Sequence, residues 1–103
     1  MRDFYYLYFG VGLGGCMVQE GAIVRGSHGN AGEIGHLPLI PNGEPCSCGN
    51  RGCLERYLSC EAMERRAQSI GIEGWIAEAA PLLRSALVAI ENLFDPQTIM
   101  LGG

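Results

Sequence analysis

GEIGHLPLIPNGEPCSCGNRGCLE, residues 32–55, is the stretch that decides how the middle of this chain folds. It supplies one imidazole and three thiols within eighteen consecutive positions. Such a donor set can close a tetrahedral Zn(II) site. A site that uses four protein ligands is structural, because a catalytic zinc keeps one position open for water. The candidate ligands are His36, Cys46, Cys48 and Cys53.

A disulfide framework is the alternative use of the five cysteines. The odd count, a C-x-C pair too close to bridge comfortably and the lack of an opening secretory signal argue against it. We therefore interpret the cluster as a cytosolic metal site. Cys16 and Cys60 lie outside the cluster, and we expect each to be a small buried hydrophobic residue.

Two acidic residues flank the cluster. Glu33 lies in a glycine-rich loop, where a plain solvated carboxylate is the alternative interpretation. Glu55 falls in the first turn of an expected helix, where an acid also stabilises the helix dipole. Carboxylates beside a rigid loop are suitable acceptors for sugar hydroxyls, which require directional hydrogen bonds. From the residues alone, both interpretations of each carboxylate stay open.

The composition suits one compact domain of 103 residues, 48% of them hydrophobic. No apolar run approaches the ~18 residues that cross a bilayer, so we expect no membrane partner and a cytoplasmic location. The net charge is −4 and lysine is absent. This disfavours a duplex-binding surface, because phosphate contacts need clustered lysine and arginine.

Hydrophobic periodicity and turn residues predict strands and helices in alternation, and therefore an α/β fold. Residues 4–9 form an unbroken aromatic and aliphatic run, typical of a buried strand. A hairpin is expected around Glu20-Gly21. The expected strands are 4–9, 17–19, 22–25, 37–40 and 98–101, and the expected helices are 54–58, 59–69 and 73–94.

Local signals predict where the helices begin and end. Ser59 can cap the second helix at its start, and Gly71 ends it. Pro81 lies inside the third helical pattern, where it must kink the helix or begin a new one. Asp95-Pro96 stops that helix.

A glycine segment follows the first strand and has two interpretations. Its backbone N–H groups could approach a phosphate. It does not match the dinucleotide fingerprint, because a hairpin rather than a helix is expected after it, and it lacks the Lys-Ser/Thr of a Walker loop. A plain tight turn is the alternative. The glycines are Gly10, Gly12, Gly14 and Gly15.

Both ends of the chain have the character of core strands. Residues 4–9 open it, and residues 98–101 run into Gly102-Gly103. Domain boundaries are usually polar and exposed, so we expect the chain to be a piece of a larger domain.

Residues 32–36 and 45–55 resemble the metal signature of the ROK family, which groups bacterial sugar kinases with sugar-responsive repressors. Residues 92–96 and 99–103 resemble the family's helix-to-strand step toward its nucleotide side. The resemblance runs over residues 4–103. It implies part of an actin-like, ribonuclease H-like domain with a mixed sheet, helices and a zinc loop. Residues 1–103 would be a single partial domain: a strand, glycine loop and hairpin in 1–25, the sugar and zinc loop in 26–58, and helices with the terminal strand in 59–103.

The resemblance also implies roles for individual residues. His36 would serve both metal and sugar through its two ring nitrogens. A hexose or N-acetylhexosamine would be the ligand, and members usually dimerise. The implied zinc ligands are His36, Cys46, Cys48 and Cys53, the implied sugar contacts are Glu33, His36 and Glu55, and the implied second phosphate loop is Gly10, Gly12, Gly14 and Gly15.

The chain departs from the family pattern in ways that bear on catalysis. The family's catalytic aspartate and first phosphate loop would precede Met1, so this chain holds no catalytic residue and we expect it to be inactive alone. ATP and Mg(II) would be needed only by a full-length kinase. Val11 replaces the threonine of the usual G-T-G and cannot donate a hydrogen bond to phosphate, which favours a regulator. The family also has more chain around residues 70–75.

Three hypotheses follow from these observations. The first is the zinc-braced sugar-binding portion of a transcriptional regulator, which binds DNA only through a segment outside this chain. The second is a fragment of an ATP-dependent hexose or N-acetylhexosamine kinase, similar to a glucokinase. The third is a structural remnant with no ligand beyond zinc.

Overall fold

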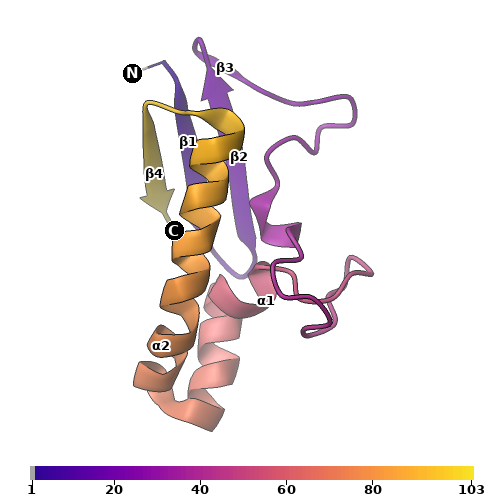
Figure 1. Ribbon diagram of the computed structural model, residues 1–103, viewed down its shortest axis with the longest axis vertical. Coiled ribbons are helices and arrows are strands. Elements are labelled where there is room, and N and C mark those ends of the chain that lie inside the picture. Colours follow the sequence, from indigo (N-terminus) through magenta and orange to yellow (C-terminus); the bar gives the residue numbers. More distant parts are fainter. Residues whose placement is uncertain (1) are drawn as a thin grey trace.

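The computed structural model describes residues 2–103, which form a four-stranded mixed sheet with helices packed on it (Figure 1). The strand order is β3-β2-β1-β4. β1 pairs antiparallel with β2 and parallel with β4, so the α/β fold class is confirmed. The strands are β1 (Phe4–Phe9), β2 (Leu13–Gln19), β3 (Ala22–Ile23) and β4 (Thr98–Gly102).

The centre of the sheet is β1, where side chains alternate between two faces. Tyr5 and Leu7 are fully buried on one face, and Tyr8 on the other face is exposed. β2 begins at Leu13, earlier than the predicted strand at 17–19. The sequence pattern missed this start because Leu13 is followed by two glycines, Gly14 and Gly15, whose pairing with β1 is a contact that only the fold supplies.

The hairpin around Glu20-Gly21 is confirmed, with positive φ angles of 51° and 78° at those residues. β3 is shorter than predicted and ends at Ile23. The predicted strand at 37–40 is wrong. This segment makes only an isolated bridge between Pro38 and Cys53, because Pro38 has no N–H to donate to a ladder.

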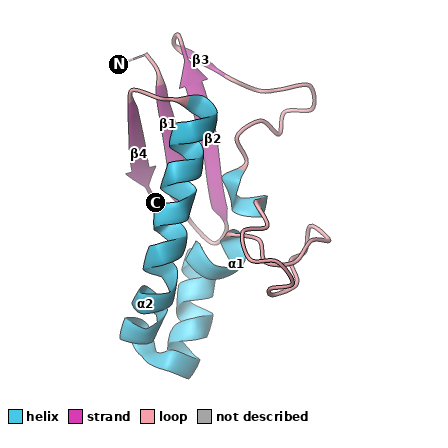
Figure 2. Cartoon of the chain, viewed as in Figure 1, coloured by secondary structure: helices cyan, strands magenta, loops and turns pink. Residues whose placement is uncertain are grey.

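Residues 36–53 carry the four candidate metal ligands and form the metal loop. Two helices follow it, α1 (Glu55–Leu58) and α2 (Cys60–Phe94). The side-chain oxygen of Ser59 accepts a hydrogen bond from the Ala62 N–H at 3.1 Å, as predicted for a cap. Gly71 adopts φ 77° and ψ 164° and divides α2 into two arms that fold back on each other (Figure 2).

Two effects were predicted at Pro81, a kink or the start of a new helix, and the start of a new helix there is wrong. Among the described residues of α2, the non-helical backbone lies at Gly71, ten positions earlier. Pro81 is exposed, and the helix continues through it. Asp95 ends the helix in the left-handed conformation with φ 47°, as predicted for the Asp-Pro stop.

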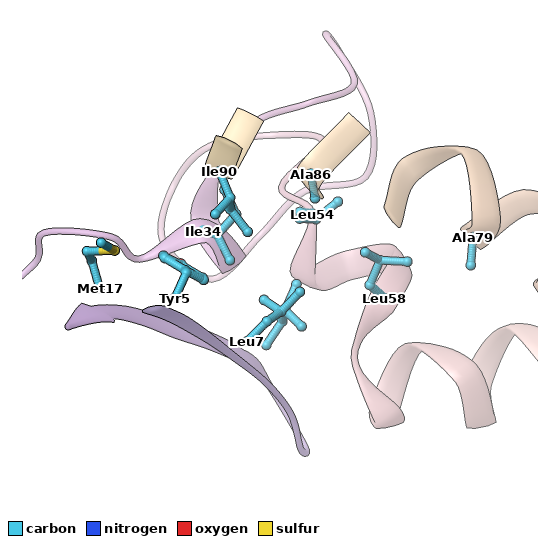
Figure 3. Close-up of a cluster of buried hydrophobic side chains, with 10 residues drawn as sticks. Tyr5, Leu7, Met17, Ile34, Leu54, Leu58, Ala79, Ala86 and Ile90 are labelled. Carbon is cyan, nitrogen blue, oxygen red and sulfur yellow. The ribbon is translucent and has the colours of Figure 1, made fainter. Parts of the chain in front are cut away.

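The core lies between the sheet and the second arm of α2 (Figure 3). Ile34, in the short 3-10 helix η1 (Ile34–His36), is buried in this core. Its burial holds the neighbouring Glu33 and His36 beside β2, which η1 contacts. The buried residues are Tyr5, Leu7, Leu13, Met17, Ile34, Leu54, Leu58, Ala79, Ala86 and Ile90.

Candidate metal centre and adjoining carboxylates

The four predicted metal ligands come together. The ligand atoms of His36, Cys46, Cys48 and Cys53 all lie within 4.8 Å of one another. The Nδ1 of His36 is 3.7 Å from the Cys46 Sγ, and the Cys48 and Cys53 sulfurs are 3.5 Å apart. Zinc bond lengths of about 2.0–2.3 Å put tetrahedral ligand atoms roughly 3.5–3.8 Å apart, so the cluster could hold such an ion.

Glycines make this compact loop possible. Gly52 has φ 77°, and a methyl group added there would overlap the carbonyl oxygen of Ile40. A methyl group added at Gly43 would lie 2.8 Å from the Gly52 Cα. The backbone of Cys46 closes the turn by accepting a hydrogen bond from the Gly49 N–H at 3.0 Å. The close packing of these backbone segments directs the three thiols to one point.

The thiols differ in their electrostatic surroundings. Burial raises the pKa of the Cys53 thiol to about 12. A hydrogen bond from the Asn50 backbone lowers the pKa of Cys48, and contact with the Cys53 thiol lowers it further. A metal ion binds thiolates, so its binding at this cluster releases protons. All five cysteines are free thiols, so no disulfide competes for the ligands.

The metal loop is tied to α2 by a charge network that the sequence did not predict. Glu44 forms ion pairs with Arg66 at 2.6 Å and with Arg65 at 3.2 Å. The Glu44 N–H donates to the Tyr57 hydroxyl at 3.0 Å, and the Trp75 indole donates to the Tyr57 carbonyl at 2.8 Å. The adjacent Arg65 and Arg66 were the only sign of this network in the sequence, but their partner Glu44 lies more than twenty positions away.

Two of the three predicted sugar contacts share one hollow of about 340 Å³. Glu33 is exposed and His36 is half-buried, and both line this hollow with Leu93 and Phe94 from the end of α2. Its size is in the range of small-ligand sites.

Glu55 faces the β1–β2 turn, residues 10–12, rather than this hollow. Its Oε1 accepts a hydrogen bond from the Leu13 N–H at 2.8 Å. The carbonyl oxygen of Leu13 packs against Gly35, where an added methyl group would overlap it. The peptide groups of Leu13 therefore connect Glu55 with the 3-10 helix that carries His36.

The glycine segment divides between a turn and a strand. The Gly10 N–H donates to the Gly12 carbonyl at 2.9 Å, which closes the β1–β2 turn. Gly14 and Gly15 belong to β2. The Val11 side chain is 84% exposed at the tip of the turn.

The cysteines outside the cluster differ from expectation. Cys16 is half-buried, whereas Cys60 is exposed, so the prediction of a buried residue is wrong at Cys60. Cys60 is the first residue of α2, and its backbone N–H donates to the Gly10 carbonyl at 2.8 Å. This backbone bond holds Cys60 at the surface beside the glycine turn.

None of the helices within residues 2–103 combines the length and apolarity that crossing a bilayer requires.

Comparison with known proteins places these features in a family context. The sequence profile of the ROK family matches residues 1–103. A glucokinase of Halalkalibacterium halodurans is 43% identical over 67 residues, which cover 64% of this chain and 20% of that protein. The DNA-binding transcriptional dual regulator NagC of Escherichia coli K12 is 33% identical over 121 residues, which cover 89% of this chain and 30% of that protein.

A solved structure matches the fold over 99% of this chain. It is a ROK family glucokinase from Streptomyces griseus in complex with glucose and AMPPNP, with a TM-score of 0.78 and 28% identity. The match covers 45% of that chain. The present chain thus spans less than half the length of each of these three relatives.

Proposed function

Because the chain belongs to the ROK family, we propose that residues 32–55 form a zinc-braced sugar site in a sugar-responsive transcriptional regulator. The observation that carries this proposal is the convergence of one imidazole and three thiols beside a hollow that Glu33 and His36 line together. A regulator of this kind binds DNA through a segment outside this chain. The family holds both regulators and kinases. The similarity to the regulator NagC supports the first of these classes for this chain.

His36 connects the metal to the sugar in this proposal. Its Nδ1 faces the Cys46 sulfur and belongs to the metal side, which leaves Nε2 to carry the proton. A protonated Nε2 donates a hydrogen bond to a sugar oxygen. Zinc would supply rigidity to the ring and no chemical step, because four protein ligands fill its coordination.

Glu33 and Glu55 would accept hydrogen bonds from sugar hydroxyls. An ionised carboxylate accepts hydrogen bonds and donates none, so it discriminates between different arrangements of sugar hydroxyls. A hexose or an N-acetylhexosamine offers several hydroxyls to such acceptors. The glucose in the Streptomyces griseus relative supports this class of ligand.

A kinase fragment is the second candidate, and the kinship with glucokinases supports it. In that case ATP and Mg(II) would act in the full-length protein, with phosphate approaching Gly10, Gly12, Gly14 and Gly15. Val11 argues against this role, since its side chain offers no hydrogen-bond donor at the tip of the turn. A homodimer and a cytoplasmic location complete the proposal.

The test is sugar binding and sugar phosphorylation by the full-length protein. Calorimetric titration with glucose, mannose and N-acetylglucosamine is expected to give saturable binding of one sugar, with no ATP-dependent phosphorylation. Sugar should also change the affinity for promoter DNA, because a switch requires different sugar affinities in its two states. Phosphorylation of the bound sugar would refute the regulator proposal and support the kinase. Absence of binding to all three sugars would overturn the sugar site.

A further inference from the structure

The β1–β2 turn makes direct contact with one of the proposed sugar carboxylates. We propose that Gly12 is a positioning residue for sugar binding, because its missing side chain makes room for the carboxylate of Glu55. This inference rests on the proposed function and assigns the turn a role beyond phosphate contact. Figure 1 shows the turn reaching the start of α1, where Glu55 lies.

The steric argument is specific to Gly12. A methyl group built at Gly12 would lie 2.5 Å from the Oε1 of Glu55, closer than side-chain carbons approach other atoms. A methyl group at Gly14, two residues later, would meet nothing within 4 Å. Any residue other than glycine at position 12 therefore displaces the Glu55 carboxylate or the turn itself.

The hydrogen bond at the same carboxylate fixes its orientation. The Leu13 N–H donates to the Oε1 of Glu55 at 2.8 Å, and a bond to an ionised acceptor is stronger than one between neutral groups. A carboxylate has two oxygens and about four acceptor positions. One bond from Leu13 therefore orients Glu55 and leaves acceptor positions for sugar hydroxyls.

The turn is held to the helices at a second point. The carbonyl of Gly10 accepts a hydrogen bond from the Cys60 N–H at 2.8 Å, at the start of α2. The turn is thus bonded to Glu55 at the start of α1 and to Cys60 at the start of α2. Displacing Glu55 changes one of the two contacts that seat the turn on the helices.

Linkage then couples the sugar to the turn. A sugar that binds Glu55 in its present orientation favours the bond between Glu55 and Leu13, and that bond favours the sugar by the same factor. Sugar occupancy is therefore communicated to the β1–β2 turn through Gly12 and Leu13. The effect does not depend on a bound nucleotide.

The experiment compares Gly12→Ala with Val11→Ala in the full-length protein, without nucleotide. Val11 is the matched control because it lies in the same turn with its side chain in solvent. Gly12→Ala is expected to weaken sugar binding about tenfold, since the orienting hydrogen bond to a charged group is lost. Val11→Ala is expected to stay within about twofold of wild type. Both variants should retain wild-type metal content.

Hydrogen exchange of the Leu13 amide gives a second measurement that does not need the variant to fold. In the wild-type protein, sugar is expected to slow exchange of this amide, because linkage strengthens its bond to Glu55. Equal sugar affinity in the two variants, or unchanged Leu13 exchange on sugar addition, overturns the role of Gly12. A wild-type protein that binds none of the three sugars overturns the proposed function instead.

Discussion

The hydroxyl of Tyr5 links the centre of the sheet to the loop that carries Glu33, and removing it tests that link. Tyr5 is fully buried in β1, and its hydroxyl donates a hydrogen bond to the Gly32 carbonyl. Gly32 directly precedes Glu33, so this bond fixes the loop one residue before the proposed sugar contact. Tyr5→Phe removes the donor and keeps the ring.

The expected loss of stability follows from burial. A net hydrogen bond contributes about 0.5–1.5 kcal/mol, and a buried acceptor left unpaired costs about 1–3 kcal/mol. The ring stays in place against Phe94, with ring centres 5.5 Å apart, so no large cavity opens. We therefore expect a loss of about 1–3 kcal/mol in the free energy of unfolding, together with weaker sugar binding through a less fixed Glu33.

Urea unfolding measures this loss, with Tyr8→Phe as the matched control. Tyr8 lies in the same strand and is 47% exposed, so the same chemical change there should cost less than about 0.5 kcal/mol. Equal effects of the two substitutions would refute the reasoning. A destabilised Tyr5→Phe protein with unchanged sugar affinity would refute only the proposed link between Tyr5 and Glu33.

The same residue predicts a pH dependence. Burial raises the pKa of Tyr5 from 10.0 to about 12. A group whose folded pKa is raised contributes stability that is fully present below its unfolded pKa and is lost as the pH rises through the folded value. The stability difference between wild type and Tyr5→Phe should therefore shrink between pH 10 and pH 12. A constant difference over that window would show that the phenol does not titrate as its burial requires.

Three further substitutions test the metal loop. Cys48→Ser should lower zinc content, stability and sugar affinity together, because the free energy of metal binding contributes to the free energy of folding. Elemental analysis measures the zinc content, and calorimetry measures stability and sugar affinity. Unchanged sugar binding would mean that the metal does not organise the site. Glu44→Gln should cost about 1 kcal/mol in urea unfolding and less at high salt, because its arginine pairs are partly exposed. Glu64→Gln is the control, since Glu64 is exposed on α2, the helix that carries both arginines. A salt-independent loss would exclude the ion pairs as its cause. Gly52→Ala should lower the free energy of unfolding by more than about 2 kcal/mol, because backbone strain at φ 77° adds to the overlap with Ile40. Gly49→Ala, at φ 98° with open space around it, should show the cost of the strain alone. Equal losses in the two variants would exclude the overlap as a cause.

Local chemistry was enough to predict much of the fold. The aromatic run of β1, the Ser59 cap and the Gly71 break each follow from residues within a few positions of the feature. The early start of β2 did not follow, because glycines have no strand preference of their own and pair here through β1. Pro81 misled for the opposite reason: a local rule allowed a new helix to begin there, but α2 continues through Pro81 and is interrupted at Gly71.

The candidate site shows the same division between near and distant contacts. The four candidate metal ligands lie within eighteen positions, and their spacing predicted the cluster that the structure brings together. Glu33, His36 and Glu55 were predicted as one group, but the bond from Glu55 to Leu13 spans 42 positions. The ion pairs of Glu44 with Arg65 and Arg66 span 21 and 22 positions. Such contacts depend on how helices and sheet are assembled, which spacing along the chain does not encode.

The parallel pairing of β1 with β4 has a consequence for the order of assembly. Phe4 lies opposite Thr98, so β1 gains its second neighbour only from residues 98–102, which follow the whole of α2. Contacts of such long sequence separation form slowly, because a long loop must close first. The metal loop, in contrast, needs only residues close in sequence. If residues 36–53 bind zinc as proposed, we therefore expect the zinc-bound loop to form before β4 joins the sheet, so that metal supply acts on the chain during its synthesis.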